Sequence, residues 1–327
     1  MNARALHVVP GASALDPPDA LTHSGRMVLA LSCDAAYAMP LATTLRSMVE
    51  ANRAHWPVEV HVLVDGVPDA LRQRVSDSLP AGSAAIRWVD ADLSAYAAFP
   101  ALVGSRATYA RLLVPQILPA HYRRALYLDA DILVLRDLGE LWHADLQGAS
   151  LGAVRDGMDA SRRSGAPAFE RVPRVRRYFN AGVLLMDLAK WRASGVADRA
   201  LRYLQENPRS PYADQDALNV ACDGDWKELG PKWNHQTLYH PGSLAERPAI
   251  VHFITGDKPW DASIPNPHAR FYDQFRRRTL FARTGRERMR DAAAAGWAHT
   301  KTALKRIPFL RTTLHRIGSE GATHPAN

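Results

Sequence analysis

Two aspartates stand one residue apart at the point where a buried strand is expected to end. Residues 125–128 form a short apolar run of strand character, which stops at Asp129, Ala130 and Asp131 before a second apolar run begins at Ile132. Two carboxylates at the end of a buried strand are costly unless a cation compensates their charge. Hard divalent cations prefer oxygen ligands, and a phosphorylated substrate commonly completes their coordination. The pair therefore suggests a site for a metal ion and a diphosphate at the edge of a sheet.

The Asp-x-Asp spacing is not specific by itself. It recurs in this chain at Asp90 and Asp92, at Asp214 and Asp216, and at Asp223 and Asp225. A helix cap or an ordinary loop aspartate is the alternative interpretation of such a pair. Support for the metal hypothesis must therefore come from other parts of the chain.

Strand and helix candidates alternate along the chain. We expect strands at 27–32, 58–64, 84–89, 125–128, 151–154, 181–186 and 249–254, and helices at 40–54, 69–79, 188–206, 214–221 and the first part of 108–118. This alternation predicts an α/β fold with a Rossmann-like, mostly parallel sheet flanked by helices. Ligands of such sheets bind outside the carboxyl ends of the strands. Asp34, the aspartate pair and His252 all lie at or near such ends, which supports a shared site.

The net charge of +8 is unevenly distributed. From residue 270 onward the chain carries 13 Lys and Arg against 4 Asp and Glu, and the remainder is nearly neutral. This distribution argues against a nucleic-acid-binding fold and for a polybasic appendage. In 292–317, apolar residues at helical spacing form one face with basic residues mostly off it. Such a segment can lie on an anionic membrane surface, or pack on the protein's own surface.

These patterns predict three regions: a disordered leader at 1–25, a globular domain at 26–280 and a basic amphipathic C-terminal helical tail at 281–327. No apolar run approaches the roughly 18–20 residues of a membrane span, and the leader lacks the apolar core of a signal peptide. Cys33 and Cys222 lie in apolar segments, which favours a reducing, cytoplasmic environment. The basic tail in turn suggests peripheral attachment to the inner face of the membrane. Glycine-rich phosphate motifs are absent from the sequence, which disfavours NAD binding and P-loop chemistry.

Six segments occur together in a fixed order that is far more specific than any one of them. They are Asp34-Ala-Ala-Tyr37, Ala107-Thr-Tyr-Ala-Arg111-Leu, Tyr127-Leu-Asp-Ala-Asp131, Tyr178-Phe-Asn-Ala-Gly-Val-Leu-Leu-Met-Asp-Leu188, Asp214-Gln-Asp-Ala-Leu-Asn219 and Val251-His-Phe-Ile-Thr-Gly-Asp-Lys-Pro-Trp260. Over about 27–275 the chain thereby resembles glycosyltransferase family 8. The resemblance implies a GT-A fold and retaining transfer of a hexose, glucose or galactose, from a UDP-sugar to an acceptor hydroxyl.

The resemblance also implies a metal centre. It matches Asp129, Asp131 and His252 to the ligands of a Mn²⁺ ion that holds the donor diphosphate. An imidazole beside two carboxylates fits Mn²⁺ better than Mg²⁺, although Mg²⁺ is possible. Lys258 matches a lysine that contacts the diphosphate, with Gly256 beside it. The alternatives are a core histidine for His252 and a surface lysine for Lys258.

Further residues are matched to the donor nucleotide and sugar. Asp34 and Tyr37 match residues at the uracil, with a helix cap and a core aromatic as alternatives. Arg111 matches a residue near the donor sugar, with a helix surface charge as the alternative, and Ala130 a residue that contacts the UDP-sugar. Asn180, Asp214 and Gln215 match residues that line the sugar pocket, and Asp156 matches a ligand of a sugar hydroxyl. Asp156, Asp214 and Gln215 form the expected catalytic group. An amide is a poor nucleophile, so Gln215 on the β-face of the sugar favours front-face attack over double displacement.

No motif in the sequence identifies the acceptor. It is expected to be a glycan, a lipid-linked saccharide or another hydroxyl compound. Residues 161–177 hold six arginines broken by glycine and proline, and this basic loop fits either an anionic acceptor or a solvated surface. Two other interpretations remain: a nucleotidyltransferase of the same fold, and a non-catalytic protein that binds membrane surfaces through its tail.

Overall fold

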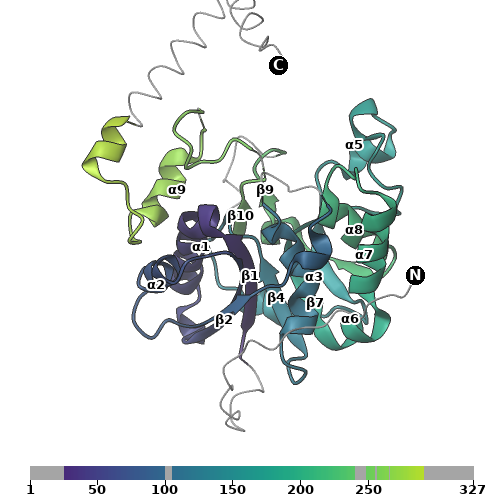
Figure 1. Cartoon of the computed structure of the whole chain (residues 1–327), viewed down its shortest axis with the longest axis horizontal. Coiled ribbons are helices and arrows are strands. Elements are labelled where there is room, and N and C mark those ends of the chain that lie inside the picture. Colours follow the sequence, from purple (N-terminus) through teal and green to yellow (C-terminus); the bar gives the residue numbers. More distant parts are fainter. Residues whose placement is uncertain (1–25, 100–104, 240–247, 255, 265, 291–327) are drawn as a thin grey trace, which may run out of the picture. The chain divides into compact units, whose positions relative to one another are not determined.

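The computed structural model of the chain (Figure 1) describes residues 26–99, 105–239, 248–254, 256–264 and 266–290. The chain divides into two compact units, which are described separately. One comprises Met1–Ile254 with Arg278–Phe281, and the other Thr255–Arg277 with Ala282–Asn327. The predicted leader at 1–25 and the amphipathic segment at 292–317 lie outside the described residues.

A seven-stranded sheet forms the centre of the first unit. Its strands are β1 (Val28–Asp34), β2 (Val58–Asp65), β3 (Ala84–Asp90), β4 (Arg124–Leu128), β6 (Leu151–Arg155), β7 (Phe179–Asp187) and β8 (Trp226–Glu228). Their order across the sheet is β3-β2-β1-β4-β7-β6-β8. All pairings are parallel except those of β7, which runs antiparallel to β4 and β6. The predicted α/β fold with a mostly parallel sheet is confirmed.

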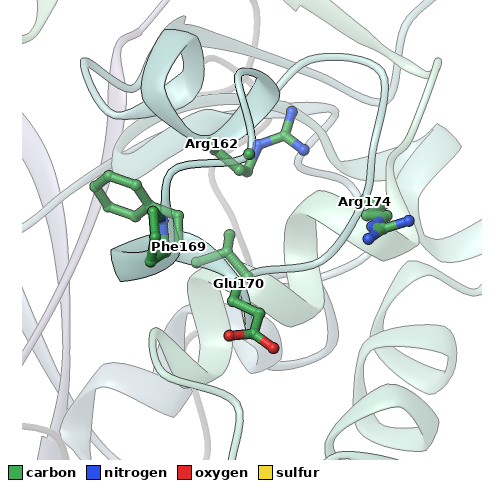
Figure 2. Close-up of a pocket in the computed structure, with 7 residues that line it drawn as sticks. Arg162, Phe169, Glu170 and Arg174 are labelled. Atoms are coloured by element: carbon green, nitrogen blue, oxygen red, sulfur yellow. The ribbon is translucent and has the colours of Figure 1, made fainter.

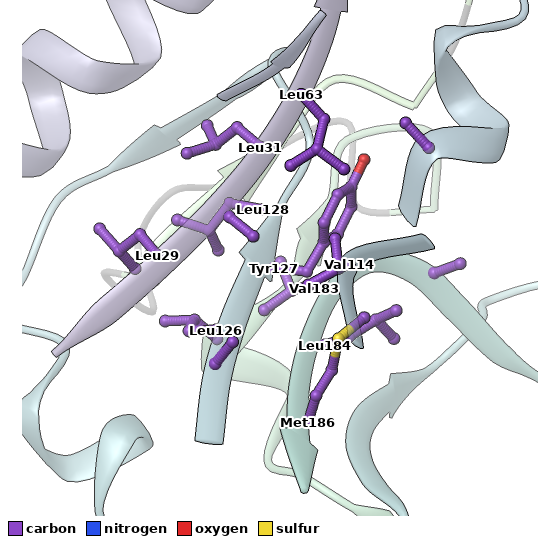
Figure 3. Packing of buried hydrophobic residues seen from close by; sticks show 14 of the residues in the cluster. Leu29, Leu31, Leu63, Val114, Leu126, Tyr127, Leu128, Val183, Leu184 and Met186 are labelled. Atoms are coloured by element: carbon purple, nitrogen blue, oxygen red, sulfur yellow. The ribbon is translucent and has the colours of Figure 1, made fainter. Parts of the chain in front are cut away.

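The central strands are buried on both faces, which explains their continuous apolar sequences. In Figure 3, Leu29 of β1, Leu126 of β4 and Leu184 of β7 contribute to one packed cluster. Pairing of β1 with β2 ends at Asp34 opposite Asp65, so the carboxyl ends of these strands lie at the same edge. Polar residues therefore collect at this edge, beyond the apolar core.

In the described part of the first unit, eight α-helices accompany the sheet. They are α1 (Ala38–Ala51), α2 (Asp69–Ser76), α3 (Ala110–Ile117), α4 (Gly139–Trp142), α5 (Asp159–Arg163), α6 (Leu188–Ser194), α7 (Val196–Glu206) and α8 (Ala213–Ala221). Figure 1 shows α1 and α2 on one side of the strands, and α6, α7 and α8 on the other. Helices thus flank both faces of the sheet, as the alternating pattern predicted.

The predicted helix over 188–206 is wrong in one respect, because two helices occupy this range. Gly195 has φ of +64° and ends α6, and α7 begins at the next residue. Glycine adopts this left-handed conformation without the steric penalty that a Cβ atom imposes. The chain therefore turns at Gly195 instead of continuing as one helix.

A second, three-stranded sheet brings distant segments beside the aspartate pair. It consists of β5 (Ile132–Val134), β10 (Ile250–His252) and β9 (His235–Gln236), in the order β5-β10-β9. β10 runs antiparallel to β5, with His252 opposite Ile132, and parallel to β9. Because β5 begins directly after Asp131, this pairing places the end of β10 next to the pair.

The described part of the second unit surrounds α9 (Ala269–Arg276). The rings of Trp260 and Tyr272 lie 5.1 Å apart, and Arg283 donates to the carboxylate of Asp273 at 2.8 Å. These contacts tie the segment before α9 to the helix and to the residues after it. None of the described helices combines the length and the apolarity that crossing a membrane requires.

Candidate active site

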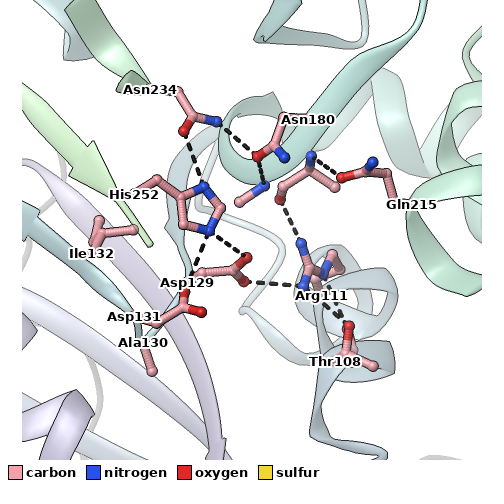
Figure 4. Close-up of polar contacts among 12 residues, drawn as sticks. Thr108, Arg111, Asp129, Ala130, Asp131, Ile132, Asn180, Gln215, Asn234 and His252 are labelled. Atoms are coloured by element: carbon pink, nitrogen blue, oxygen red, sulfur yellow. Dashed lines mark hydrogen bonds and ion pairs between the residues drawn. The ribbon is translucent and has the colours of Figure 1, made fainter. Parts of the chain in front are cut away.

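Asp129, Asp131 and His252 converge at the end of β4. The Nε2 atom of His252 lies 3.3 Å from Oδ1 of Asp131 and 3.7 Å from Oδ2 of Asp129. One ligand atom from each residue lies within 4.8 Å of the other two. The sequence predicted this convergence, and Figure 4 shows all three side chains directed toward one point. One imidazole nitrogen and two carboxylate groups fit a divalent transition-metal ion.

The imidazole of His252 is held in one orientation. Its Nδ1 atom lies 3.0 Å from Oδ1 of Asn234, and the residue is only 4% exposed. This contact directs Nε2 toward the two carboxylates. A metal-binding histidine generally has such a partner on its other ring nitrogen, and here the partner is present. The donor set and its supporting contact therefore both fit a metal ion.

Two residues that sequence reasoning did not identify shape this centre. The hydroxyl of Thr44 in α1 lies 2.8 Å from the carbonyl oxygens of both Ala130 and Ile132, and so fixes the turn that carries the aspartates. Gly182 in β7 leaves space for Asp129 and His252. A Cβ atom at Gly182 would lie 2.2 Å from Cε1 of His252 and 2.8 Å from Oδ2 of Asp129. Its place inside a strand pattern is the sequence signal of such a close approach.

Arg111 joins the metal centre to a second carboxylate. Its guanidinium is buried, 3.0 Å from Oδ1 of Asp129 and 2.8 Å from Oδ2 of Asp214, and donates at 2.6 Å to the carbonyl of Ala181. Its Cζ atom lies 5.0 Å from the centre of the Tyr127 ring. Burial opposes the charge of Arg111, but the two carboxylates offset this effect and raise its pKa. Arg111 is therefore a permanent cation beside the aspartate pair.

Asp214 is buried under this arginine. Thr108 donates to it at 2.6 Å. Burial raises the pKa of Asp214 to about 6, against the lowering effects of Arg111 and Thr108. The carboxylate predicted as part of the catalytic group thus serves here as the charge partner of Arg111.

Gln215, Asn180 and Asp156 form a cluster next to the metal centre. Gln215 accepts from the backbone N–H of Ala181 at 3.0 Å and donates to Oδ2 of Asp156 at 3.3 Å. Asn180 donates to the same oxygen at 3.0 Å. Burial raises the pKa of Asp156. The sequence placed all three residues at the sugar, and the structure brings them together.

Asp34 and Tyr37 lie beyond the end of β1. The carboxylate of Asp34 accepts from the backbone N–H of Tyr37 at 3.1 Å, so it caps the short helix Ala35–Tyr37. Burial raises the pKa of Tyr37, and the charges of Asp131, Asp129 and Asp34 raise it further. The phenol therefore lies in the electrostatic field of these three carboxylates.

Gly256 and Lys258 belong to the second unit. Gly256 accepts at its carbonyl from the backbone N–H of Lys258 at 2.9 Å, which closes a turn. The ammonium of Lys258 lies 5.9 Å from the ring centre of Trp260. Their predicted contact with the diphosphate stays a prediction.

The arginine loop (residues 161–177) follows directly from the Asp156 cluster through α5. Asp159 is fully buried in α5 and pairs with Arg162 at 2.7 Å and Arg163 at 3.1 Å. The loop encloses a hollow of about 230 Å³, drawn in Figure 2 and lined by Arg162, Gly165, Pro167, Phe169, Glu170, Val172 and Arg174. Arg174 is exposed at its rim. The loop thus presents positive charge close in the chain to the cluster of Gln215, Asn180 and Asp156.

Comparison with known proteins identifies relatives. The model of Glycosyl transferase family 8 matches residues 28–263. General stress protein A of Bacillus subtilis is 28% identical over 73% of this chain and 89% of its own length. Lipopolysaccharide 1,2-glucosyltransferase of Escherichia coli is 27% identical over 75% of each chain. The crystal structure of the galactosyltransferase LgtC with donor and acceptor sugar analogues has a TM-score of 0.69 at 27% identity, covering 80% of this chain and 99% of that one.

Proposed function

The chain belongs to glycosyl transferase family 8 and is a glycosyltransferase with the GT-A fold, and from this premise we propose a more specific reaction. The proposed reaction is transfer of a hexose, glucose or galactose, from a UDP-sugar to a hydroxyl of a glycan or lipid-linked saccharide, with retention at the anomeric carbon. The observation that carries the proposal is the convergence of Asp129, Asp131 and His252. A nitrogen and two carboxylates at the end of a strand suit a cation that binds a diphosphate.

The proposed metal ion is Mn²⁺, held by Asp129, Asp131 and His252. It would stabilise the negative charge that develops on the UDP leaving group, a contribution worth several kcal/mol. Arg111 orients the carboxylate of Asp129 through their 3.0 Å contact. The resemblance alone gives Lys258 and Gly256 a role at the diphosphate, and Asp34 and Tyr37 a role at the uracil.

The amide of Gln215 supports a front-face mechanism. Its oxygen accepts from the N–H of Ala181, and its nitrogen donates toward Asp156. An amide held in this way is a poor nucleophile and is better suited to steadying positive charge on the sugar. In this mechanism the leaving phosphate oxygen accepts the proton of the acceptor hydroxyl, so no separate general base is required.

A donor panel tests the proposal. The purified full chain is incubated with Mn²⁺ and each of several UDP-hexoses, and UDP release is measured with and without EDTA. We expect release from one UDP-hexose, loss of release with EDTA, and loss in Asp131→Ala. UDP release that is unchanged by EDTA would contradict the metal proposal. Formation of UTP and hexose 1-phosphate from a UDP-hexose when pyrophosphate is added, without UDP release in its absence, would favour a nucleotidyltransferase.

We further propose that the acceptor carries negative charge. The arginine loop holds six arginines and one glutamate, and it begins five residues after Asp156, which contacts Asn180 and Gln215. An anionic glycan would be attracted to this end of the donor site.

The basic residues beyond 280 are proposed to hold the protein at an anionic membrane surface. Cys33 and Cys222 are buried free thiols, which suits a reducing, cytoplasmic compartment.

A further inference from the structure

The side chain of Asn234 is 2% exposed and lies behind the imidazole of His252, opposite the two aspartates. We propose that Asn234 is a positioning residue, which keeps the proton of the neutral imidazole on Nδ1 and leaves the lone pair of Nε2 for the metal ion. This inference rests on the proposed metal-binding role of His252. It concerns a residue that lies outside the ligand set.

The polarity of the contact follows from a backbone group. The N–H of Gly182 can only donate, and it lies 3.0 Å from one side-chain atom of Asn180, which must therefore be its oxygen. The same oxygen lies 2.8 Å from a side-chain atom of Asn234, which must therefore be its nitrogen. The remaining atom of Asn234 is the oxygen that faces Nδ1 of His252 at 3.0 Å. An oxygen can only accept here, so Nδ1 must carry a proton.

The orientation of Asn180 is also fixed by its other hydrogen-bond partner. The nitrogen of Asn180 donates to Oδ2 of Asp156 at 3.0 Å, which agrees with the orientation that Gly182 imposes. Both asparagines therefore have a single orientation that satisfies all their partners (Figure 4). The side chains lie in a buried region, where an unsatisfied polar group is costly, so the reversed orientation is disfavoured.

The consequence for His252 concerns its other nitrogen. A neutral imidazole has one N–H, and the nitrogen without it is the one that binds a metal. With the proton on Nδ1, the lone pair of Nε2 points to Asp129 and Asp131. Without Asn234, the ring could place its proton on Nε2 and donate to Asp131, 3.3 Å away, which would block the metal site. Removal of such a partner typically weakens metal binding about 10–100-fold.

Binding of Mn²⁺ to the full-length protein, followed by the electron paramagnetic resonance of free Mn²⁺, tests the inference. Asn234→Leu keeps the branched shape of the side chain and removes the acceptor, and we expect about 10–100-fold weaker binding. Asn234→Asp keeps an oxygen acceptor for Nδ1 and should bind Mn²⁺ more tightly than Asn234→Leu. Asn52→Leu is the matched control, because Asn52 is also buried and joined to the carbonyl of Met48 and the N–H of Leu138. It should bind as the wild type does.

The outcomes separate this inference from the proposed function. If the wild type binds no Mn²⁺, or if His252→Ala binds Mn²⁺ as tightly as the wild type does, both the proposed metal site and the role of Asn234 fail. If binding depends on His252 but Asn234→Leu matches Asn52→Leu, only the role of Asn234 fails. A second measurement does not depend on a folded Asn234 variant. Nitrogen NMR of the wild type with ¹⁵N-labelled histidines reports which ring nitrogen of His252 carries the proton, and the signals missing from His252→Gln are those of His252. A protonated Nδ1 is expected, and an unprotonated Nδ1 overturns the inference.

Discussion

Gly182 occupies the middle of β7, where glycine weakens a strand unless its missing side chain has a purpose. The purpose is room for His252 and Asp129. The convergence of Asp129, Asp131 and His252 could be predicted, because carboxylates at a strand end and a histidine in a matching motif are visible in the sequence. The roles of Gly182, Thr44 and Asn234 depend on contacts between elements far apart in the chain. No local pattern specifies such contacts, and only the isolated glycine left a signal.

Replacing Gly182 tests the space that the metal ligands need. In Gly182→Ala, the added carbon would lie 2.2 Å from the His252 ring and 2.8 Å from Oδ2 of Asp129, so the arrangement of these two side chains must change. We expect Mn²⁺ affinity to fall at least as much as it does when a metal-binding histidine loses its hydrogen-bond partner, about 10–100-fold. The rate of UDP release should fall with it.

The control is Gly152→Ala in β6. Its new carbon would approach the side chain of Leu146 at 2.8 Å, and its next nearest neighbours belong to Leu229 and not to the proposed metal ligands. This variant should lose stability and keep its Mn²⁺ affinity. Equal affinities of the two variants would show that crowding at Gly182 does not reach His252.

The buried carboxylate of Asp214 makes stability depend on pH. Burial raises its pKa from 3.8 to about 6, so between these values the folded state holds a proton that the unfolded state has released. The stabilising contribution is complete below pH 4 and is lost as the pH rises through 6, a change of about 3 kcal/mol. The stability of the wild type relative to Asp214→Asn should therefore fall between pH 4 and pH 7.

Urea unfolding of both proteins at several pH values measures this difference. Asp156 and Asp216, whose pKa values burial also raises, are present in both proteins, so their contributions largely cancel. Parallel pH dependences of the two proteins would contradict the raised pKa of Asp214.

At the scale of elements, the long strands and helices follow from sequence periodicity, whereas the short ones do not. β8 and β9 have three and two residues, too few for any alternation to appear. Yet β9 and the residue before it, Asn234, help to complete the metal centre. The break at Gly195 was missed because an isolated glycine in a helical pattern is often tolerated. Its left-handed conformation becomes evident only in three dimensions.

The arginine loop is the element that should distinguish acceptors. Arg174→Gln removes one exposed charge from its rim and leaves the Asp159 ion pairs intact. Because surface charge acts mainly on association, we expect a KM for an anionic acceptor raised a few-fold, with kcat little changed. UDP release by hydrolysis of the donor alone should not change.

Arg136→Gln provides the comparison, because Arg136 is also exposed and lies outside the loop. Kinetics with one anionic and one neutral glycan, at low and high salt, measure the effect. An identical KM change for both glycans in Arg174→Gln would count against an anionic acceptor.

At the scale of the whole molecule, the excess positive charge and the proposed active-site residues lie in different parts of the sequence. The residues before 270 are nearly neutral and contain every proposed metal, nucleotide and sugar ligand, whereas those from 270 onward carry a net +9. Neutrality near the site is consistent with carboxylates and arginines that pair with each other, as Asp129, Asp214 and Arg111 do. The excess of basic residues is not needed for this pairing, and so it is available for an external anionic partner.

Truncation after residue 285 tests what that excess does. The removed residues include Arg286, Arg288, Arg290 and the lysines and arginines beyond them, each of which is worth about 1 kcal/mol near an anionic membrane. The truncated protein should keep its UDP release in solution and lose sedimentation with anionic liposomes, whereas the full chain should sediment at low salt and dissociate at high salt. Neutral liposomes are the control, because they offer the same apolar interior without the charge. Equal sedimentation of the two proteins with anionic liposomes would place the membrane contact elsewhere in the chain, and equal sedimentation of the full chain with both kinds of liposome would exclude an electrostatic attraction.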